Sequence, residues 1–354
     1  MRDALAENAL RIGLFRFTIA PLQPLEVPAV NKGNMLRGGF GHTFRRLCCI
    51  PQCKDVRACP LDGSCPYKAV FEPSPPPGAD RLSKNQDIPR PFVFRAPPTR
   101  QTRFEKGERF EFGLVLIGRA LDFLPYFVLS FRDLAGQGLG LNRAVCELEN
   151  VTACNFDESA VASVYQFSDQ IFHTPEPLDL AAWVEQRMRR LGPSRITVRF
   201  LTPTHLTFDG KIVKQPEFHH LFKRVRDRVN ALSSFYGGGP VNADFKGLGE
   251  GAEKVQTVSS KIEWVERFRT SSRTHQRHEL SGFVGECTYE FPVSSFDLLA
   301  SNRELLQWLI CGELLHVGKH TAWGNGWYQL YNGESERSEC DGIRIRSEIV
   351  HQEK

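Results

Sequence analysis

The first expected element of this chain follows from its apolar positions. Leucine, isoleucine and phenylalanine recur at alternating positions of residues 10–20, LRIGLFRFTIA, which is the pattern of a half-buried strand. A helix is expected from about Asn34, because four apolar residues recur there with a period of 3.6 and form one stripe. They are Leu36, Phe40, Phe44 and Leu47. The pattern then predicts, in chain order, strands at 91–96 and 109–117, a helix at 121–134 and a strand at 143–151.

The second half of the chain predicts the same order of elements. Its last helix is expected to open with the capping box Ser301-x-x-Glu304 and to end near Gly318. The other elements expected here are a strand at 196–201, a helix at 217–235, strands at 257–266 and 282–291, and a final strand within 321–331. Each half therefore has the order βαββαβ, which is typical of ferredoxin-like or RRM-type domains. The predicted fold is α+β, with two tandem ferredoxin-like domains.

The length of the chain allows two domains. With 354 residues and 41% hydrophobic content, each domain can bury its own core. We expect an N-terminal domain at 1–175 with a cysteine-rich insertion at 48–70, a C-terminal domain at 176–335 and a charged tail at 336–354. No run approaches the roughly 18 apolar residues of a membrane span. The start, MRDALAENALRIG, lacks the apolar core of a signal peptide, so the expected location is the cytoplasm.

The net charge of +4 is too small to indicate a nucleic-acid partner by itself. The distribution of charge changes that picture, because Lys and Arg gather at 37–57, 223–228 and 267–277. Such clusters can line a basic groove on a nearly neutral protein. The alternative is that each cluster is a solvated helix face.

The segment 318–328, GKHTAWGNGWY, combines residue types that bind phosphates and unpaired bases. Its glycines let the backbone approach a ligand closely, and their amides can form an anion-binding concavity. Lysine and histidine add donors, and tryptophan offers a face for stacking. The residues expected to contact RNA here are Gly318, Lys319, His320, Gly324, Gly326 and Trp327. The alternative is a helix C-cap followed by aromatic residues of the core.

Four stretches of the chain carry a family resemblance when they are taken together with this glycine-rich segment. They are MLRGGFGHTFRRLCC (35–49), CPLDGSCPYKAVFEP (59–73), HHLFKRVRDRVNALSSFYGGG (219–239) and FRTSSRTHQRHELSGFVGECTYE (268–290). In this order they resemble the CRISPR precursor-RNA processing endoribonucleases of the RAMP superfamily. The resemblance spans nearly the whole expected fold.

This resemblance implies an endoribonuclease that grips a CRISPR repeat and cuts it without a metal ion. The ribose 2′-hydroxyl would attack the adjacent phosphate and leave a 2′,3′-cyclic phosphate, a 5′-hydroxyl and a crRNA with a 5′ repeat-derived handle. The implied partners are repeat RNA, crRNA and subunits of a CRISPR effector complex. One alternative is a non-catalytic RAMP subunit that binds the crRNA handle. Another, a metal-cluster protein with incidental basic patches, leaves the duplicated order of elements unexplained.

The family commonly has a histidine in or near the first helix, and His42 matches that location. At 100° per residue His42 falls opposite the apolar stripe, so a buried histidine is not expected there. His42 is the predicted catalytic residue, and an ordinary surface histidine is the alternative. Gly38, one turn earlier, would leave room for the RNA backbone. The cations expected to contact RNA are Lys32, Arg37, Arg45, Arg46, Arg269 and Arg273.

Four cysteines have the spacing C-x3-C-x5-C-x5-C, which places four thiols in one short segment. They are Cys49, Cys53, Cys59 and Cys65, with Cys48 as a substitute for the first. In a reducing compartment this clustering favours metal ligation over disulfides. A structural zinc ion or an iron–sulfur cluster is expected, a metal-free reduced insertion is the alternative, and no metal is expected in catalysis. The cysteines expected in the core are Cys146, Cys154, Cys287 and Cys311.

Overall fold

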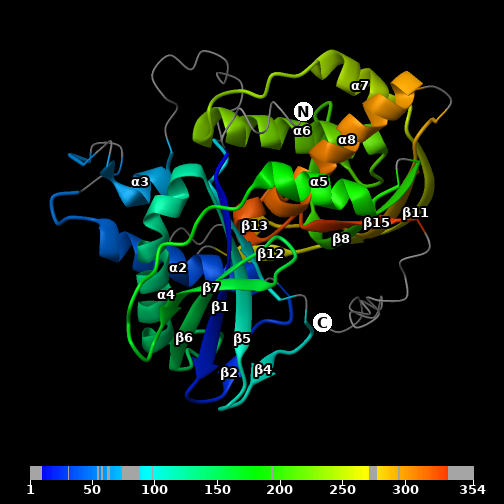
Figure 1. Cartoon of the computed structure of the whole chain (residues 1–354). Coiled ribbons are helices and arrows are strands. Elements are labelled where there is room, and N and C mark those ends of the chain that lie inside the picture. The colour runs from blue at the N-terminus through cyan, green and yellow to red at the C-terminus, as the bar shows by residue number, and fades with distance from the viewer. Residues whose placement is uncertain are drawn as a thin grey trace.

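The structure is a computed structural model that describes residues 10–333 with short internal gaps. The gaps are residue 31, residues 54–55, 57–58, 62–63 and 74–87, residues 98 and 193, and residues 271–276 and 294–295. The described residues form a mixed α/β fold with two large antiparallel sheets, one from each half of the chain (Figure 1). Within these residues, no helix combines the length and the apolar character needed to cross a membrane.

The first sheet has five strands in the order β3-β5-β1-β6-β7. Their bounds are β1 Ile12–Pro21, β3 Phe92–Arg95, β5 Phe110–Ile117, β6 Cys146–Cys154 and β7 Ala160–Gln166. Helices α2 (Lys32–Cys48) and α4 (Leu124–Gln137) lie side by side against this sheet (Figure 1). Phenylalanine rings fill the space between them, and the Phe40 ring stacks on those of Phe127 and Phe131 with centroids 4.9 and 5.2 Å apart. The short elements of this half are β2 Leu25–Glu26, β4 Arg103–Phe104, α3 Pro66–Phe71 and the 3₁₀ helix η4 Gly118–Phe123.

The second sheet has four strands in the order β11-β14-β8-β15. Their bounds are β8 Arg195–Thr204, β11 Gln256–Val265, β14 Gly282–Glu290 and β15 Tyr328–Asn332. The helices of this half gather on one side of the sheet (Figure 1), and they are α5 Leu180–Arg190, α6 Phe218–Tyr236, α7 Phe245–Glu253 and α8 Phe296–Leu315. Two small ribbons and a 3₁₀ turn complete it, namely β9 Leu206–Phe208 with β10 Lys211–Val213, β12 Phe268–Thr270 with β13 Arg277–Glu279, and η5 Thr321–Trp323.

Strand β1 contributes to both halves of the molecule through its two faces. Ile12 and Leu14 belong to the hydrophobic core of the second half, whereas Phe15 and Phe17 belong to the core of the first. Successive side chains of a strand point to opposite faces, so one strand can serve two cores. The two halves therefore share an apolar interface, which fixes the position of one relative to the other.

Most expected elements are present, with boundaries that differ by a few residues. The expected start of the last helix at Ser301 is wrong, because α8 already begins at Phe296. A Ser-x-x-Glu pattern is also compatible with a helix interior, and no proline or glycine separates Phe296 from Ser301. The final strand begins only at Tyr328, because Thr321–Trp323 forms a 3₁₀ turn. Leu47 does not complete the buried stripe, since it is 37% exposed near the end of α2.

Candidate RNA-binding site at the junction of the two halves

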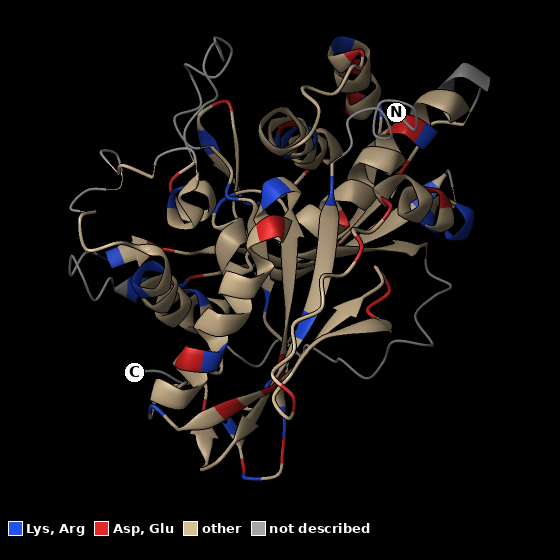
Figure 2. Cartoon of the chain, turned by 60° about the vertical axis from the view of Figure 1, so that its left-hand side comes forward, with Lys and Arg blue, Asp and Glu red and all other residues tan. Residues whose placement is uncertain are grey.

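Helix α2 presents His42 on its outer face, away from the core. His42 and Arg45 are exposed, whereas Phe40 and Phe44 on the inner face are fully buried. Gly38 lies one turn before His42 and is also exposed, with open space where a Cβ would lie. The predicted orientation of His42 is therefore confirmed, while its catalytic role stays a prediction. The cationic residues of α2 are not accompanied by any acidic residue on that helix (Figure 2).

The glycine-rich loop of the second half packs against the first turn of α2. A Cβ atom added to Gly33 would overlap the carbonyl oxygen of Trp323, far inside the 3.0 Å that real Cβ atoms keep. The same loop touches β3, where a Cβ on Gly324 would lie 2.6 Å from the carbonyl oxygen of Phe94. Two motifs that are almost 300 positions apart in the chain therefore meet in one place.

The end of this loop serves the packing of the protein itself. Gly326 has φ +73°, and an added Cβ would overlap the carbonyl oxygen of Val317. The Gly326 amide donates to the carbonyl oxygen of Pro203 at 3.1 Å. Trp327 is only 7% exposed, and the Arg95 guanidinium lies 5.0 Å from its ring centroid. Gly324, Gly326 and Trp327, all expected to contact RNA, thus contact the protein's own segments, as the alternative interpretation of this loop predicts.

The beginning of the loop is more accessible to a ligand. Lys319 is exposed, although Gly318 beside it lies against the carbonyl oxygen of His205. His320 and Trp323 are partly exposed, and their rings stack with centroids 4.9 Å apart. Burial, followed by the neighbouring His205 and Lys319, lowers the pKa of His320 to about 4. His320 is consequently a neutral hydrogen-bonding group at neutral pH.

Two of the cations expected to bind RNA have partners within the protein. Lys32 is only 4% exposed, and its ammonium group donates to the carbonyl oxygens of Ala29 at 3.2 Å and Thr99 at 2.8 Å. Burial lowers the pKa of Lys32. Arg46 forms an ion pair with Asp133 on α4, with 3.4 Å between Nη2 and Oδ2. Lys32 is therefore not open to a phosphate in this structure, whereas the Arg46 side chain is 54% exposed and stays accessible from solvent.

Arg37 and Arg269 lie where α2 meets the β12–β13 ribbon. Nη1 of Arg269 donates to Oδ1 of Asn34 at 3.3 Å, and its guanidinium lies 4.6 Å from the Trp323 ring centroid. The Arg37 guanidinium lies 4.3 Å from the Phe71 ring centroid. The structure therefore brings these two expected RNA contacts from separate halves to one place, whereas Arg273 lies outside the described residues.

The outer face of the second sheet is not a basic surface. Arg199 pairs with Glu286 across β8 and β14, and Arg195 pairs with Glu290, each at 2.6 Å between nitrogen and oxygen. Thr197 and Thr288 share a hydrogen bond of 2.9 Å between these pairs. Because the charges cancel in cross-strand pairs, this face attracts phosphates weakly.

The thiols of the cysteine-rich segment lie close to one another. Cys53 makes thiol contacts with Cys49 and Cys59, and Cys65 makes one with Cys59. Burial and these neighbours raise the pKa of Cys53 to about 11, and burial raises that of Cys65. These contacts are pairwise, and the sulfurs do not form a group of mutually close ligand atoms within 4.8 Å among the described residues, so the metal site stays a prediction. A metal ion bound there would have to displace the thiol protons. The four cysteines expected in the core are all buried: Cys146, Cys154, Cys287 and Cys311.

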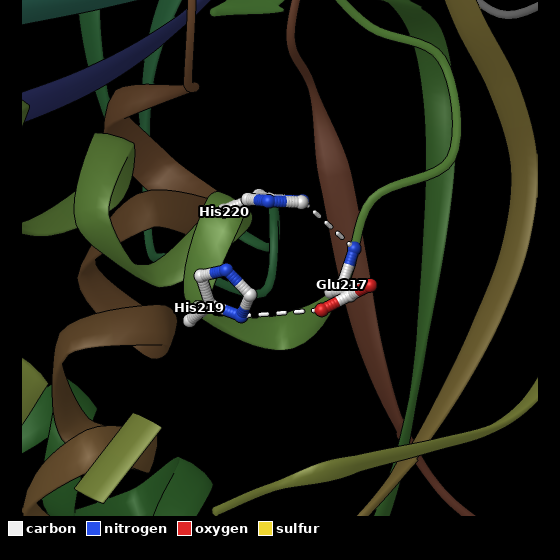
Figure 3. A group of neighbouring side chains, drawn as sticks. All are labelled: Glu217, His219 and His220. Carbon is white, nitrogen blue, oxygen red and sulfur yellow. Dashed lines mark hydrogen bonds and ion pairs between the residues drawn. The ribbon is translucent and has the colours of Figure 1, made fainter. Parts of the chain in front are cut away.

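A group of three possible metal ligands, whose ligand atoms lie within 4.8 Å of one another, opens helix α6 (Figure 3). Nδ1 of His219 lies 3.5 Å from Oε2 of Glu217, and the Glu217 amide donates to Nδ1 of His220 at 3.3 Å. The Glu217 side chain in turn accepts from the backbone amide of His220, which completes a capping box. Helix capping therefore accounts for Glu217 and His220.

Asn34, Tyr67 and Arg90 were not identified from the sequence, although all three lie at this junction. The ring centroids of Tyr67 and Phe71 are 4.9 Å apart, and the Arg45 guanidinium lies 5.8 Å from the Tyr67 ring centroid. Arg90 donates from Nε to the carbonyl oxygen of Phe71 at 3.1 Å. Tyr67 lies within the stretch 59–73 that carries the family resemblance, but nothing in that stretch marks it as a site residue, and Asn34 and Arg90 belong to no motif.

Comparisons with known proteins agree with the resemblance found in the sequence. A family model described as CRISPR-associated endoribonuclease Cas6 matches residues 198–328, and a model described as an N-terminal domain matches residues 10–177. An uncharacterized protein of Archaeoglobus fulgidus is 23% identical over 299 residues, which cover 84% of this chain and 91% of that protein.

Solved structures share the fold at low sequence identity. A Cas6 product complex is 15% identical, with a TM-score of 0.53 over 90% of this chain and 99% of that chain. Thermus thermophilus Cas6 is 16% identical, with a TM-score of 0.51 over 91% of this chain and 99% of that chain. The predicted resemblance to RAMP-type endoribonucleases that process CRISPR repeat RNA is confirmed.

Proposed function

We propose that this chain, a relative of the CRISPR repeat-processing endoribonucleases, cuts CRISPR repeat RNA without a metal ion in catalysis. The ribose 2′-hydroxyl attacks the adjacent phosphate, and the products are a 2′,3′-cyclic phosphate and a 5′-hydroxyl. The downstream product is a crRNA with a repeat-derived 5′ handle, which is bound by this chain and passed to subunits of a CRISPR effector complex in the cytoplasm.

The observation that carries this proposal is the contact between α2 and the glycine-rich loop. Asn34, Gly38 and His42 follow one another at intervals of four residues along one side of α2. The contact brings Arg269 of the second half to the Asn34 end of this row. Eight residues of helix separate Asn34 from His42, which is about 12 Å along the axis. A strand of RNA held at Arg269 can therefore run over the open position at Gly38 and reach His42.

His42 and Arg45 have separate roles in this mechanism. His42 transfers a proton to or from the reacting oxygens, because imidazole exchanges protons near neutral pH and no backbone contact restricts its access to solvent. Arg45 is exposed less than one turn further along α2, where its guanidinium can stabilise the charge that develops on the phosphate.

The remaining parts of the proposal concern architecture. The strand orders β6-β1-β5-β3 and β15-β8-β14-β11 are those of a ferredoxin-like unit, which supports two tandem units of this kind. The four clustered thiols support a structural zinc ion or iron–sulfur cluster that holds α3 beside α2. In this proposal the metal supplies folding energy and takes no part in proton transfer.

The test is cleavage of the CRISPR repeat encoded beside the gene, measured in a single turnover with EDTA present. We expect cutting to persist in EDTA, and His42→Ala to abolish it while RNA affinity stays within a few-fold of the original. His173→Ala is the matched control, because His173 is also exposed and lies outside this site. Dependence on added Mg²⁺ would contradict the metal-independent mechanism. If the unaltered protein binds the repeat tightly without cutting it, the handle-binding subunit is the better description.

A further inference from the structure

Three arginines from separate segments converge beside α2. Arg37 lies on α2, Arg90 precedes β3, and Arg269 lies on β12. Arg37 and Arg90 both contact Phe71, and Arg269 contacts Asn34, less than one turn before Arg37 on α2. After burial, the charges of Arg90 and Arg269 are among the groups that lower the pKa of Arg37. In the part of the chain that the structure describes, no carboxylate pairs with any of them.

Arg37 is the least solvated member of this cluster. Its guanidinium lies against the rings of Phe71 and Phe92, at 4.3 and 5.7 Å from their centroids. Its Nε is buried without a hydrogen-bond partner. Burial and the two like charges lower the pKa of Arg37 to about 9, and among the groups acting on it only Tyr67 opposes this effect. Arg37 as a whole is partly exposed, but its Nε is shielded from water without a partner, and desolvating part of a cation costs free energy unless an anion or acceptor compensates it.

Each guanidinium is held by few contacts and keeps further donors. Arg90 uses Nε for the Phe71 carbonyl oxygen, and Arg269 uses Nη1 for Asn34 while its own Nε has no partner. Arg37 lies against Gly41, where an added Cβ would come within 2.7 Å of its Nη1. A guanidinium has five N–H donors in a fixed fork that matches a phosphate. The cluster is therefore positively charged and keeps unused hydrogen-bond donors.

We propose that Arg37, Arg90 and Arg269 together bind one phosphate group of an RNA strand and so clamp that strand across both halves of the protein. The identity of the strand rests on the proposed function, whereas the anion site itself does not. The anion supplies the negative charge that the cluster lacks, and the ion pairs offset the cost of burying Arg37. Binding at this site also fixes Arg269, and with it the β12–β13 ribbon, against α2.

The first experiment uses inorganic phosphate as the probe. Thermal unfolding is measured in phosphate and in chloride at equal ionic strength for the full chain, Arg37→Met, Arg90→Met and Arg189→Met. Methionine keeps an unbranched apolar stem against Phe71. Arg189 is the control for net charge, because its side chain is 77% exposed and pairs with Glu185. We expect phosphate to raise the unfolding temperature of the full chain and of Arg189→Met, and to raise it much less in the other two variants.

The second experiment measures the salt dependence of binding to a non-cognate uridine oligomer. We expect the slope of log affinity against log salt to become shallower by about one in Arg37→Met and in Arg90→Met, and to stay unchanged in Arg189→Met. A phosphate effect and a salt slope equal to those of the full chain in both Arg37→Met and Arg90→Met would overturn the site. Arg90 is exposed, so Arg90→Met tests the site even where Arg37→Met fails to fold. If these effects appear but the repeat is never cut, the anion site stands and the nuclease proposal fails.

Discussion

Two glycines of α2 allow a direct test of the contact between this helix and the glycine-rich loop. Gly33 and Gly38 both lie within the helix, and each is replaced by alanine in turn. At Gly38 an added Cβ meets nothing within 4 Å, whereas at Gly33 it would overlap the carbonyl oxygen of Trp323. The same substitution on the same helix is therefore free of contacts at Gly38 and sterically blocked at Gly33.

The expected magnitudes follow from these surroundings. Gly38→Ala removes the conformational freedom of glycine in a helix and should stabilise the protein by about 0.5–1 kcal/mol. Gly33→Ala gains at most the same amount, but it must displace a backbone oxygen, and overpacking of this kind costs about 1–3 kcal/mol. We expect Gly33→Ala to be destabilised overall, with the two variants about 2 kcal/mol apart in free energy of unfolding.

The assay is urea unfolding followed by circular dichroism and by the fluorescence of the five tryptophans, of which Trp323 lies at the contact. RNA cleavage by Gly33→Ala should also fall, because a displaced loop moves Arg269 away from α2. The reasoning is refuted if Gly33→Ala is as stable as Gly38→Ala, since α2 would then not pack against the loop as the structure has it.

Three further expectations concern His42, Cys59 and His320. His42→Ala should lower the single-turnover rate about 10²- to 10⁴-fold, because one proton-transfer group is lost; a rate equal to that of the His173→Ala control would rule out this role. Cys59→Ser should lower the unfolding temperature and the amount of zinc or iron bound per chain, without a separate catalytic defect. Unaltered protein that contains neither metal would rule out the proposed metal site. His320 has a pKa of about 4 against an ordinary 6.5, so the unfolded state binds the extra proton between these values and stability falls as pH falls through this window. We expect His320→Asn to lose less stability than the unaltered protein over this range. The contribution of His320 to the loss is at most about 2 kcal/mol at pH 5, before solvent screening is allowed for. An equal fall of the urea midpoint in both proteins between pH 7 and pH 5 would contradict this expectation.

Much of the local structure was predictable from the sequence, because the periods of strands and helices are properties of neighbouring residues. The stripe Leu36, Phe40 and Phe44 placed α2 correctly, and the same geometry turned His42 outward. The errors arose where a local signal has two meanings. Ser301-x-x-Glu304 describes a helix start equally well as an interior turn. The RNA contacts expected at Gly324 and Gly326 stay a prediction, although both glycines pack closely against Phe94 and Val317.

The sequence by itself determined the order of the elements, the outward face of α2 and the resemblance to RNA-processing endoribonucleases. Only the tertiary structure decided which cations are available to a ligand, because pairing depends on partners that are distant in the chain. Lys32 is engaged by the carbonyl oxygens of Ala29 and Thr99, whereas Arg37 and Arg269 have no carboxylate partner among the residues that the structure describes. The register of β8 with β14 likewise pairs Arg195 and Arg199 with glutamates, which neutralise their charges. Composition counts all of these charges alike, whereas the fold distinguishes cations that pair within the protein from those that we propose to bind a phosphate.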